Sequence, residues 1–250
     1  MKVKVSLVSY LNTLPFLYGI KNAEFSHEID LQLDIPSVCA QKLINDEVDL
    51  GLVPVAVLPQ LKEYYIVSDY CIGASGKVNS VLLLSDVPLS EIKEIHLDYQ
   101  SKTSVNLVKV LAKHLWKIQP DWKDTCEGFE NNIGGTSAGV IIGDRTFNLP
   151  KSFHYQYDLS EEWEKLTQLP FAFACWVSNK KLAPEFIQQL NNALKLGLEN
   201  IPSSLSLSKE TIHSQKLLDY LQKDIDYALD PPKTEAIQLF LDYLSDQEEP

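Results

Sequence analysis

Apolar and polar residues alternate over residues 2–8, which predicts a β-strand at the start of the chain. A short helix is expected over residues 12–19, because Pro15 is favoured in a first helical turn. The alternation returns over residues 29–35, and residues 37–46 have the start signal and apolar spacing of a helix. The chain therefore opens with a strand, a helix, a second strand and a second helix.

Residues 49–53 are a short and almost wholly apolar run. Such a run is typical of a strand inside a parallel sheet, where helices cover both faces. Another short helix is expected from Pro54 onward. This succession predicts an α/β fold of the doubly wound kind.

A second set of elements predicts a second lobe. Strands are expected over residues 80–85, 94–98, 139–142 and 171–177, and an amphipathic helix over residues 103–116. From Pro184 onward we expect mostly helix, broken near Pro202 and at Pro231–Pro232. We expect residues 1–88 and 173–250 to form the first lobe, with the C-terminal helices packed on it, and residues 89–172 to form the second.

The charge of the chain narrows the range of partners. The 250 residues carry a formal net charge of −12, so nucleic acid and anionic membranes would be repelled and are not expected partners. No apolar run approaches the ~20 residues that a membrane span needs. The first residues lack the apolar stretch of a secretory signal, so we expect a cytoplasmic protein.

The cysteines and histidines do not predict a metal site. Cys39, Cys71, Cys126 and Cys175 are widely scattered, and neither a disulfide framework nor a metal-ligand spacing is present. Cys39 and Cys175 lie among apolar residues and are expected in the core. The sequence contains no HExxH, P-loop or GxGxxG motif, so we expect neither a metal nor a cofactor.

Arg145 is the only arginine, so an anionic ligand would have to be bound largely by helix N-termini. Thr103 and Ser104 open the most strongly amphipathic helix of the second lobe, and Ser37 opens a helix of the first. Two interpretations are open for these residues. They could cap the helices, or their hydroxyls could donate to a ligand.

Three more polar residues flank predicted elements and have two interpretations each. Asn12 is either a turn or cap residue, or an amide that both donates to and accepts from a ligand. Ser80 is either a solvated serine at a strand edge or a hydroxyl directed at a ligand. Asp144 either caps a helix or contacts a substrate hydroxyl.

Eight strings occur in an order that carries a family resemblance. They are SYLN (9–12), PSVCAQKL (36–43), EVDLGLVPVA (47–56), DYCIGASGKVNSVLLLS (69–85), SKTSVNL (101–107), IIGD (141–144), YDLSEEW (157–163) and LPFAFACWV (169–177). Together they resemble the chorismate dehydratases of the futalosine route to menaquinone. The C-terminal helices match that family only in character.

The resemblance implies a two-lobed type II periplasmic-binding-protein-like fold with a ligand cleft between the lobes. It implies a hydro-lyase that converts chorismate to 3-[(1-carboxyvinyl)oxy]benzoate and water without a metal or cofactor. Asn12 would be the catalytic, substrate-orienting residue, and of its neighbours Ser9 and Tyr10 one would line the site while the other packs. The substrate-binding residues would be Ser9, Tyr10, Ser37, Ser80, Thr103, Ser104 and Asp144. Arg145 departs from the family, where a small residue is usual, and is expected at the surface.

Two other functions stay open at this point. The first is that of the sister dihydroxynaphthoate synthases, which usually carry a turn with Pro, Asn and Asp where this chain has SYLN, so the dehydratase is favoured. The second is that of a non-catalytic protein that binds a small anion. Oligomeric state is not predicted. Asp144 is the one carboxylate among the candidates, and its place at a helix start favours capping or contact to a hydroxyl over proton removal. We therefore hypothesise that the enolpyruvyl carboxylate of the substrate itself removes the C3 proton.

Overall fold

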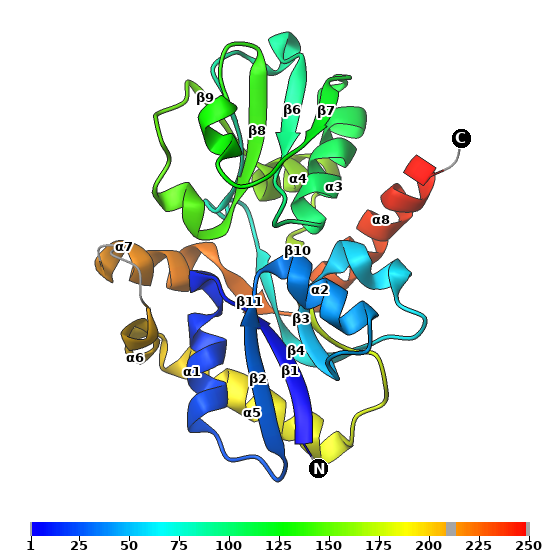
Figure 1. Ribbon diagram of the computed structural model, residues 1–250, viewed down its shortest axis with the longest axis vertical. Coiled ribbons are helices and arrows are strands. Elements are labelled where there is room, and N and C mark those ends of the chain that lie inside the picture. The colour runs from blue at the N-terminus through cyan, green and yellow to red at the C-terminus, as the bar shows by residue number, and fades with distance from the viewer. Residues whose placement is uncertain (1, 209–213, 249–250) are drawn as a thin grey trace. The chain divides into compact units, whose positions relative to one another are not determined.

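The computed structural model describes residues 2–208 and 214–248, and its contacts divide the chain into two compact units (Figure 1). The first unit comprises Met1–Gly73 and Ala172–Asp230, and the second comprises Ala74–Phe171 and Pro231–Pro250. Each unit is built on a sheet of its own. Within the described ranges, no helix is both long and apolar enough to cross a bilayer.

The first unit contains a six-stranded sheet in the order β11-β4-β10-β3-β1-β2. Its strands are β1 (Lys2–Val8), β2 (Glu28–Asp34), β3 (Leu50–Pro54), β4 (Tyr65–Ala74), β10 (Phe171–Ser178) and β11 (Asp226–Ala228). Its helices are α1 (Leu14–Asn22), α2 (Pro36–Ile44), α5 (Pro184–Glu199), α6 (Ile201–Ser204) and α7 (Ser214–Asp219). Strand β1 is parallel to β2 and β3, whereas β10 is antiparallel to β3, so the sheet is mixed.

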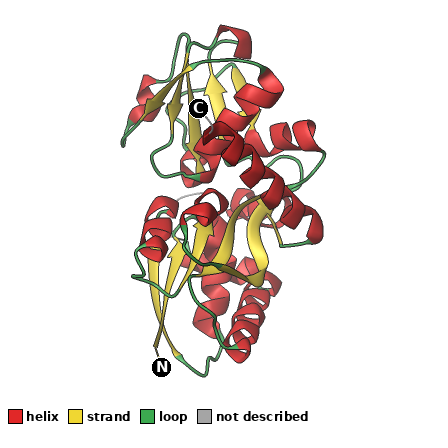
Figure 2. Ribbon diagram, turned by 90° about the vertical axis from the view of Figure 1, so that its right-hand side faces the viewer, coloured by secondary structure: helices red, strands yellow, loops and turns green. Residues whose placement is uncertain are grey.

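Helices cover both faces of this sheet (Figure 2). From β1 the chain moves to β2 on one side and then returns past β1 to β3 on the other side. Because such crossovers are right-handed, the connecting helices α1 and α2 lie on opposite faces of the sheet. Every residue of β3 and β10 is buried, which explains their continuous apolar sequences.

Two glycines let α1 and α5 approach each other closely. A Cβ atom on Gly19 would lie 1.9 Å from the carbonyl oxygen of Ala193, and one on Gly197 would lie 1.8 Å from the carbonyl oxygen of Pro15. Both neighbours are backbone atoms that cannot move aside, so any side chain at either position would force the helices apart. This contact fixes α1, and with it the segment that connects α1 to β1.

The second unit contains a five-stranded sheet in the order β7-β6-β8-β5-β9. Its strands are β5 (Val81–Ser85), β6 (Glu94–Leu97), β7 (Asp121–Asp124), β8 (Ser137–Ile142) and β9 (Tyr155–Asp158). Its helices are α3 (Thr103–Leu111), α4 (Leu159–Thr167) and α8 (Pro231–Glu248). Strand β6 is parallel to β7 and β8, whereas β5 is antiparallel to β8 and β9.

The boundaries of the units differ from those expected from the sequence. Strand β5 pairs with β8 and β9, so it belongs to the second unit and not to a first lobe that ends at residue 88. Helix α8 also belongs to the second unit instead of packing on the first. The ring of Trp163 in α4 lies 6.0 Å from that of Phe240 and 6.1 Å from that of Tyr243, and these contacts hold α8 in place.

Most predicted elements lie close to their observed bounds, but several were missed. The predictions omitted β4, β7, β9, β11 and α4. The helix expected over residues 103–116 is α-helical only to Leu111 and continues as a π-helical turn, Ala112–Trp116. Pro231 and Pro232 start α8, as proline often does in a first turn.

Candidate functional site

Asn12 lies in a short 3₁₀ turn, Leu11–Thr13, directly after β1. The turn is held from several directions: the Thr13 hydroxyl donates to the carbonyl oxygens of Val8 (2.6 Å) and Tyr10 (2.8 Å), and the Tyr227 hydroxyl donates to the carbonyl oxygen of Asn12 (3.1 Å). Neither this turn nor α1 has a side-chain cap, so Asn12 does not act as a cap residue.

The side-chain oxygen of Asn12 is buried. In the part of the chain that the structure describes, this Oδ1 atom accepts no hydrogen bond. A buried polar atom without a partner is costly and uncommon, and such atoms call for an explanation. This geometry suits an amide oxygen that accepts a hydrogen bond from a ligand.

Ser9 and Ser37 follow neighbouring strand ends in the first unit. Val8 pairs with Asp34 across the parallel strands β1 and β2, and the Ser9 N–H donates to the Asp34 carbonyl oxygen (2.9 Å). Helix α2 begins soon after Asp34 without any side-chain cap, so Ser37 does not cap it either. Ser9 is exposed, whereas Tyr10 and Ser37 are half-buried.

A charged pair stabilises this edge of the first sheet. The Asp34 carboxylate accepts from the Ser6 hydroxyl (2.8 Å) and from the Lys42 ammonium (2.7 and 2.6 Å). These contacts tie β1, β2 and α2 together. The structure thus brings Ser9, Tyr10, Asn12 and Ser37 to the carboxyl edge of β1 and β2, the edge where open α/β sheets bind ligands.

Thr103 and Ser104 open α3 in the second unit and are almost fully buried, with 2% and 3% of their surfaces exposed. Lys102 is the N-cap residue and forms no side-chain cap, and the Ser101 hydroxyl accepts the hydrogen bond from the Ser104 N–H (2.9 Å). Ser101, which the sequence analysis did not single out, thus takes the Ser104 N–H at the start of α3.

Ser80 and Asp144 meet at the junction of β5 and β8. Val81 pairs with Ile142, and the Gly143 N–H donates to the Ser80 carbonyl oxygen (2.8 Å). Ser80 is 1% exposed, so its interpretation as a solvated serine is wrong. Asp144 is half-buried in the 3₁₀ turn Gly143–Phe147, which no side chain caps.

Asp158 fixes the loop that leads to Ser80. Its Oδ2 atom accepts from the N–H groups of Val78 (3.0 Å) and Asn79 (2.7 Å), while its Oδ1 atom caps α4 through the Ser160 N–H (3.0 Å). Burial raises the pKa of this carboxyl, and the backbone donors oppose that shift. Sequence reasoning missed Asp158 because its partners in the loop are about 80 residues away.

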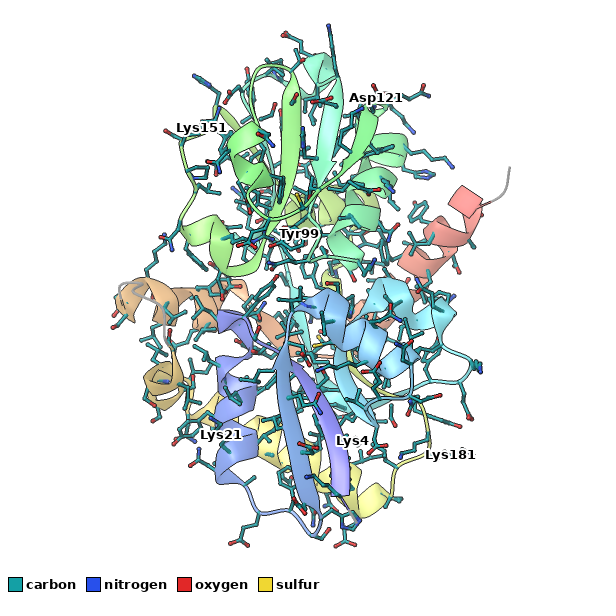
Figure 3. All side chains as sticks on the ribbon, in the orientation of Figure 1. Lys4, Lys21, Tyr99, Asp121, Lys151 and Lys181 are labelled. Atoms are coloured by element: carbon teal, nitrogen blue, oxygen red, sulfur yellow. The ribbon has the colours of Figure 1, made fainter. Side chains whose placement is uncertain are left out.

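Arg145 is not the surface residue that the sequence suggested. Its side chain is only 25% exposed and forms ion pairs with the buried Asp98 and, at 2.5 Å, with Glu130. The guanidinium also lies 5.4 Å from the ring centroid of Tyr99, the residue labelled in Figure 3. Burial raises the pKa of the Asp98 carboxyl, and the adjacent guanidinium opposes that shift.

Asp98 connects the start of α3, which carries Thr103 and Ser104, to the turn that carries Asp144; together with Ser80 these residues form the second cluster. It follows β6 and accepts from the Ile142 N–H at the end of β8 (3.0 Å), while the Ser101 N–H donates to its carbonyl oxygen (3.0 Å). The loop before α3 is thereby tied to the turn that holds Asp144. The structure thus brings Ser80, Thr103, Ser104 and Asp144 to one edge of the second sheet.

The remaining candidate chemistry is unremarkable. Cys39 and Cys175 are fully buried, and burial raises the pKa of each thiol to about 12, so both are core residues and not nucleophiles. Over residues 2–208 and 214–248, no group of three or more His, Cys, Asp or Glu side chains could hold a metal ion. The two clusters offer hydroxyls, an amide and one carboxylate.

Comparisons with known proteins identify the family of the chain. A family model described as menaquinone biosynthesis matches residues 3–246. A chorismate dehydratase from Thermus thermophilus is 25% identical over an alignment of 232 residues, which covers 84% of this chain and 84% of that protein.

Two solved structures are similar in fold. Protein AF1704 from Archaeoglobus fulgidus has a TM-score of 0.80 at 12% identity, and the match covers 98% of this chain and 97% of that one. A Candida albicans protein described as having the generic periplasmic binding protein fold has a TM-score of 0.73 at 11% identity, over 100% and 92% of the two chains. The chain thus has the two-lobed fold of periplasmic binding proteins, and it belongs to the menaquinone biosynthesis family.

Proposed function

We propose that this chain is a cytoplasmic chorismate dehydratase, which converts chorismate to 3-[(1-carboxyvinyl)oxy]benzoate and water as the first step of the futalosine route to menaquinone. The observation that carries the proposal is the buried Asn12 amide oxygen, which has no partner among the residues that the structure describes, in a chain that matches the menaquinone biosynthesis family over residues 3–246. The named relative from Thermus thermophilus supports the same reaction.

Chorismate is a dianion, and an acidic chain with one arginine must hold it mainly with neutral donors. The N-terminus of α3 suits one carboxylate, because the positive end of the helix dipole favours negative charge there. Thr103 and Ser104, both almost fully buried at this helix start, would add hydroxyl donors there. Ser9, Tyr10, Ser37 and Ser80 would complete the binding contacts.

The reaction removes a proton from C3 and a hydroxyl from C4 of the ring. The C3–H electron pair forms the new double bond as the C4–O bond breaks, and the base that takes the C3 proton passes it to the departing hydroxide to give water. Aromatisation provides the driving force. Asn12 would orient the substrate at the reacting carbons, and Asp144 would contact the C4 hydroxyl.

The base in this mechanism would be the substrate itself. Asn12, Ser80, Thr103 and Ser104 are not bases near neutral pH. The enolpyruvyl arm is attached at C3 and ends in a carboxylate close to the proton that leaves. The protein would hold that arm in place, so that the carboxylate removes the proton.

Proton NMR of the purified chain with chorismate tests the proposal directly. We expect the cyclohexadiene signals to disappear and aromatic signals of the product to replace them. Chorismate that binds but persists would support a non-catalytic anion-binding protein instead. No binding of chorismate would contradict the proposal and favour the sister dihydroxynaphthoate synthase activity.

A double variant tests the role of α3. Thr103→Val with Ser104→Ala should weaken chorismate binding by about 10²-fold, because two hydrogen bonds to a charged group are lost. Affinity and melting temperature are measured together.

Ser101→Ala is the matched control, because it removes the observed cap of the same helix. It should cost about 1 kcal/mol of stability while chorismate affinity is kept. If the double variant melts earlier yet binds chorismate as the wild type does, Thr103 and Ser104 have only a structural role.

A further inference from the structure

A cavity of about 550 Å³ lies within the second unit, at the opposite end of α3 from Thr103. Residues from the end of α3, the following π-helical turn, the start of β7 and the end of α8 line it. Its volume is in the range of about 300–1,000 Å³ that is usual for small-molecule sites. None of the residues proposed to bind chorismate lines it.

The charge of the cavity is opposite to that of the chain. Lys109, Lys113 and Lys117 line it at intervals of four residues, and Asp246 is the one carboxylate in its wall. No ion pair to any of these three lysines is found among the described residues, although eight other lysines of the chain form ion pairs. Three neighbouring ammonium groups repel one another unless an anion lies between them.

The backbone at the cavity is unusual. Residues Ala112–Trp116 form a π-helical turn, and Lys117 ends it in the left-handed region with φ of 56°. The Ile118 N–H then donates back to the Ala112 carbonyl oxygen (3.0 Å), and the chain turns into β7. π-Helical turns are rare and occur frequently at functional sites.

An aromatic side chain completes the wall. Trp122 is half-buried, and the Lys109 ammonium lies 5.8 Å from its ring centroid. Asp121, labelled in Figure 3, is its neighbour at the start of β7. His114 belongs to the same π-helical turn, and its pKa is lowered first by burial and then by Lys113 and Lys117, against a smaller opposing effect of Asp246.

We propose that this cavity is a second binding site, which takes a small organic anion that carries a planar ring. The anionic group is held by Lys113 and Lys117, and the ring packs against Trp122. The proposal does not depend on the dehydratase activity, because the two sets of residues do not overlap.

Phenyl phosphate is a suitable probe, because it joins a dianion to one aromatic ring. Calorimetry with the full chain should detect its binding, and inorganic phosphate, which lacks the ring, should bind at least about tenfold more weakly. Lys113→Gln with Lys117→Gln should weaken phenyl phosphate binding by about tenfold or more. Trp122→Leu should abolish the preference for phenyl phosphate over inorganic phosphate.

Lys21→Gln with Lys62→Gln is the matched control, since both are exposed lysines of the first unit and the change in net charge is the same (Lys21 is labelled in Figure 3). Affinity should be unchanged in this variant and in Thr103→Val with Ser104→Ala. The proposal is overturned if phenyl phosphate does not bind, if both lysine pairs have the same effect, or if only the Thr103 and Ser104 variant loses binding.

Discussion

Replacing Asn12 with alanine should lower the turnover of chorismate by about 10²–10³ while the protein still folds, because one directional contact to the reacting substrate is lost. The backbone of the turn is held by Thr13 and Tyr227 and not by the Asn12 side chain, so the fold does not depend on this amide. Its Oδ1 atom is buried without a partner among the described residues, so alanine removes no internal hydrogen bond at this atom. Steady-state rates and thermal melting measure the two effects separately.

Asn22→Ala is the matched control for this experiment. Asn22 ends α1, and its side-chain amide donates to the Tyr18 carbonyl oxygen at the exposed surface (2.8 Å). Turnover should be unchanged in this variant. If Asn12→Ala retained a rate close to that of the wild type, Asn12 would have no catalytic role, and its buried oxygen would need a different explanation.

The elements that position the site could be predicted because they depend on local signals. The alternation in β1, the apolar run in β3 and the proline in the first turn of α1 each specify a local conformation. Together they put Asn12 directly after the first strand, and they put Ser37 at the start of the second helix. In an α/β sheet these positions meet at one edge, whatever the details of packing.

The contacts that fix the second cluster could not be predicted, because their partners are far apart in sequence. Arg145 is 47 residues from Asp98, and Asp158 is about 80 residues from the loop that it holds. The residues next to Asp98 and Asp158 in the sequence do not distinguish these buried carboxylates from solvated ones. The capping role of Ser101 was missed for a different reason: in the string SKTSV, three hydroxyl residues are close enough to cap α3, and the backbone path decides between them.

The unit boundaries were misplaced for a related reason. The apolar face of α8 shows that the helix must be buried, but it does not show against which sheet. Phe240 and Tyr243 pack on Trp163, and the composition of α8 does not indicate that partner. Strand β5 was likewise predicted correctly as a strand, while its pairing with β8 and β9 depends on residues more than 50 positions later in the sequence.

The substrate-assisted mechanism gives the prediction with the largest effect. A chorismate analogue whose enolpyruvyl carboxylate is replaced by a neutral amide should bind weakly and scarcely react even at saturation, with kcat lower by at least about 10³. The amide is not a base, and the loss is part of the roughly 7–11 kcal/mol that a well-positioned intramolecular group can supply at best. Single-turnover measurements at saturating analogue separate this loss from weaker binding.

The analogue that carries the amide at the ring carboxylate is the matched control, since it loses the same charge but keeps the proposed base. It should bind weakly yet react at a substantial rate once saturated. If the enolpyruvyl amide also turned over at a rate comparable to that of chorismate, the base would belong to the protein. Asp144, the one carboxylate among the candidate residues, would then be the first to replace, and Asp144→Asn should abolish turnover of both substrates. If the substrate is its own base, Asp144→Asn should instead leave proton removal possible and reduce the rate only through the lost contact to the C4 hydroxyl.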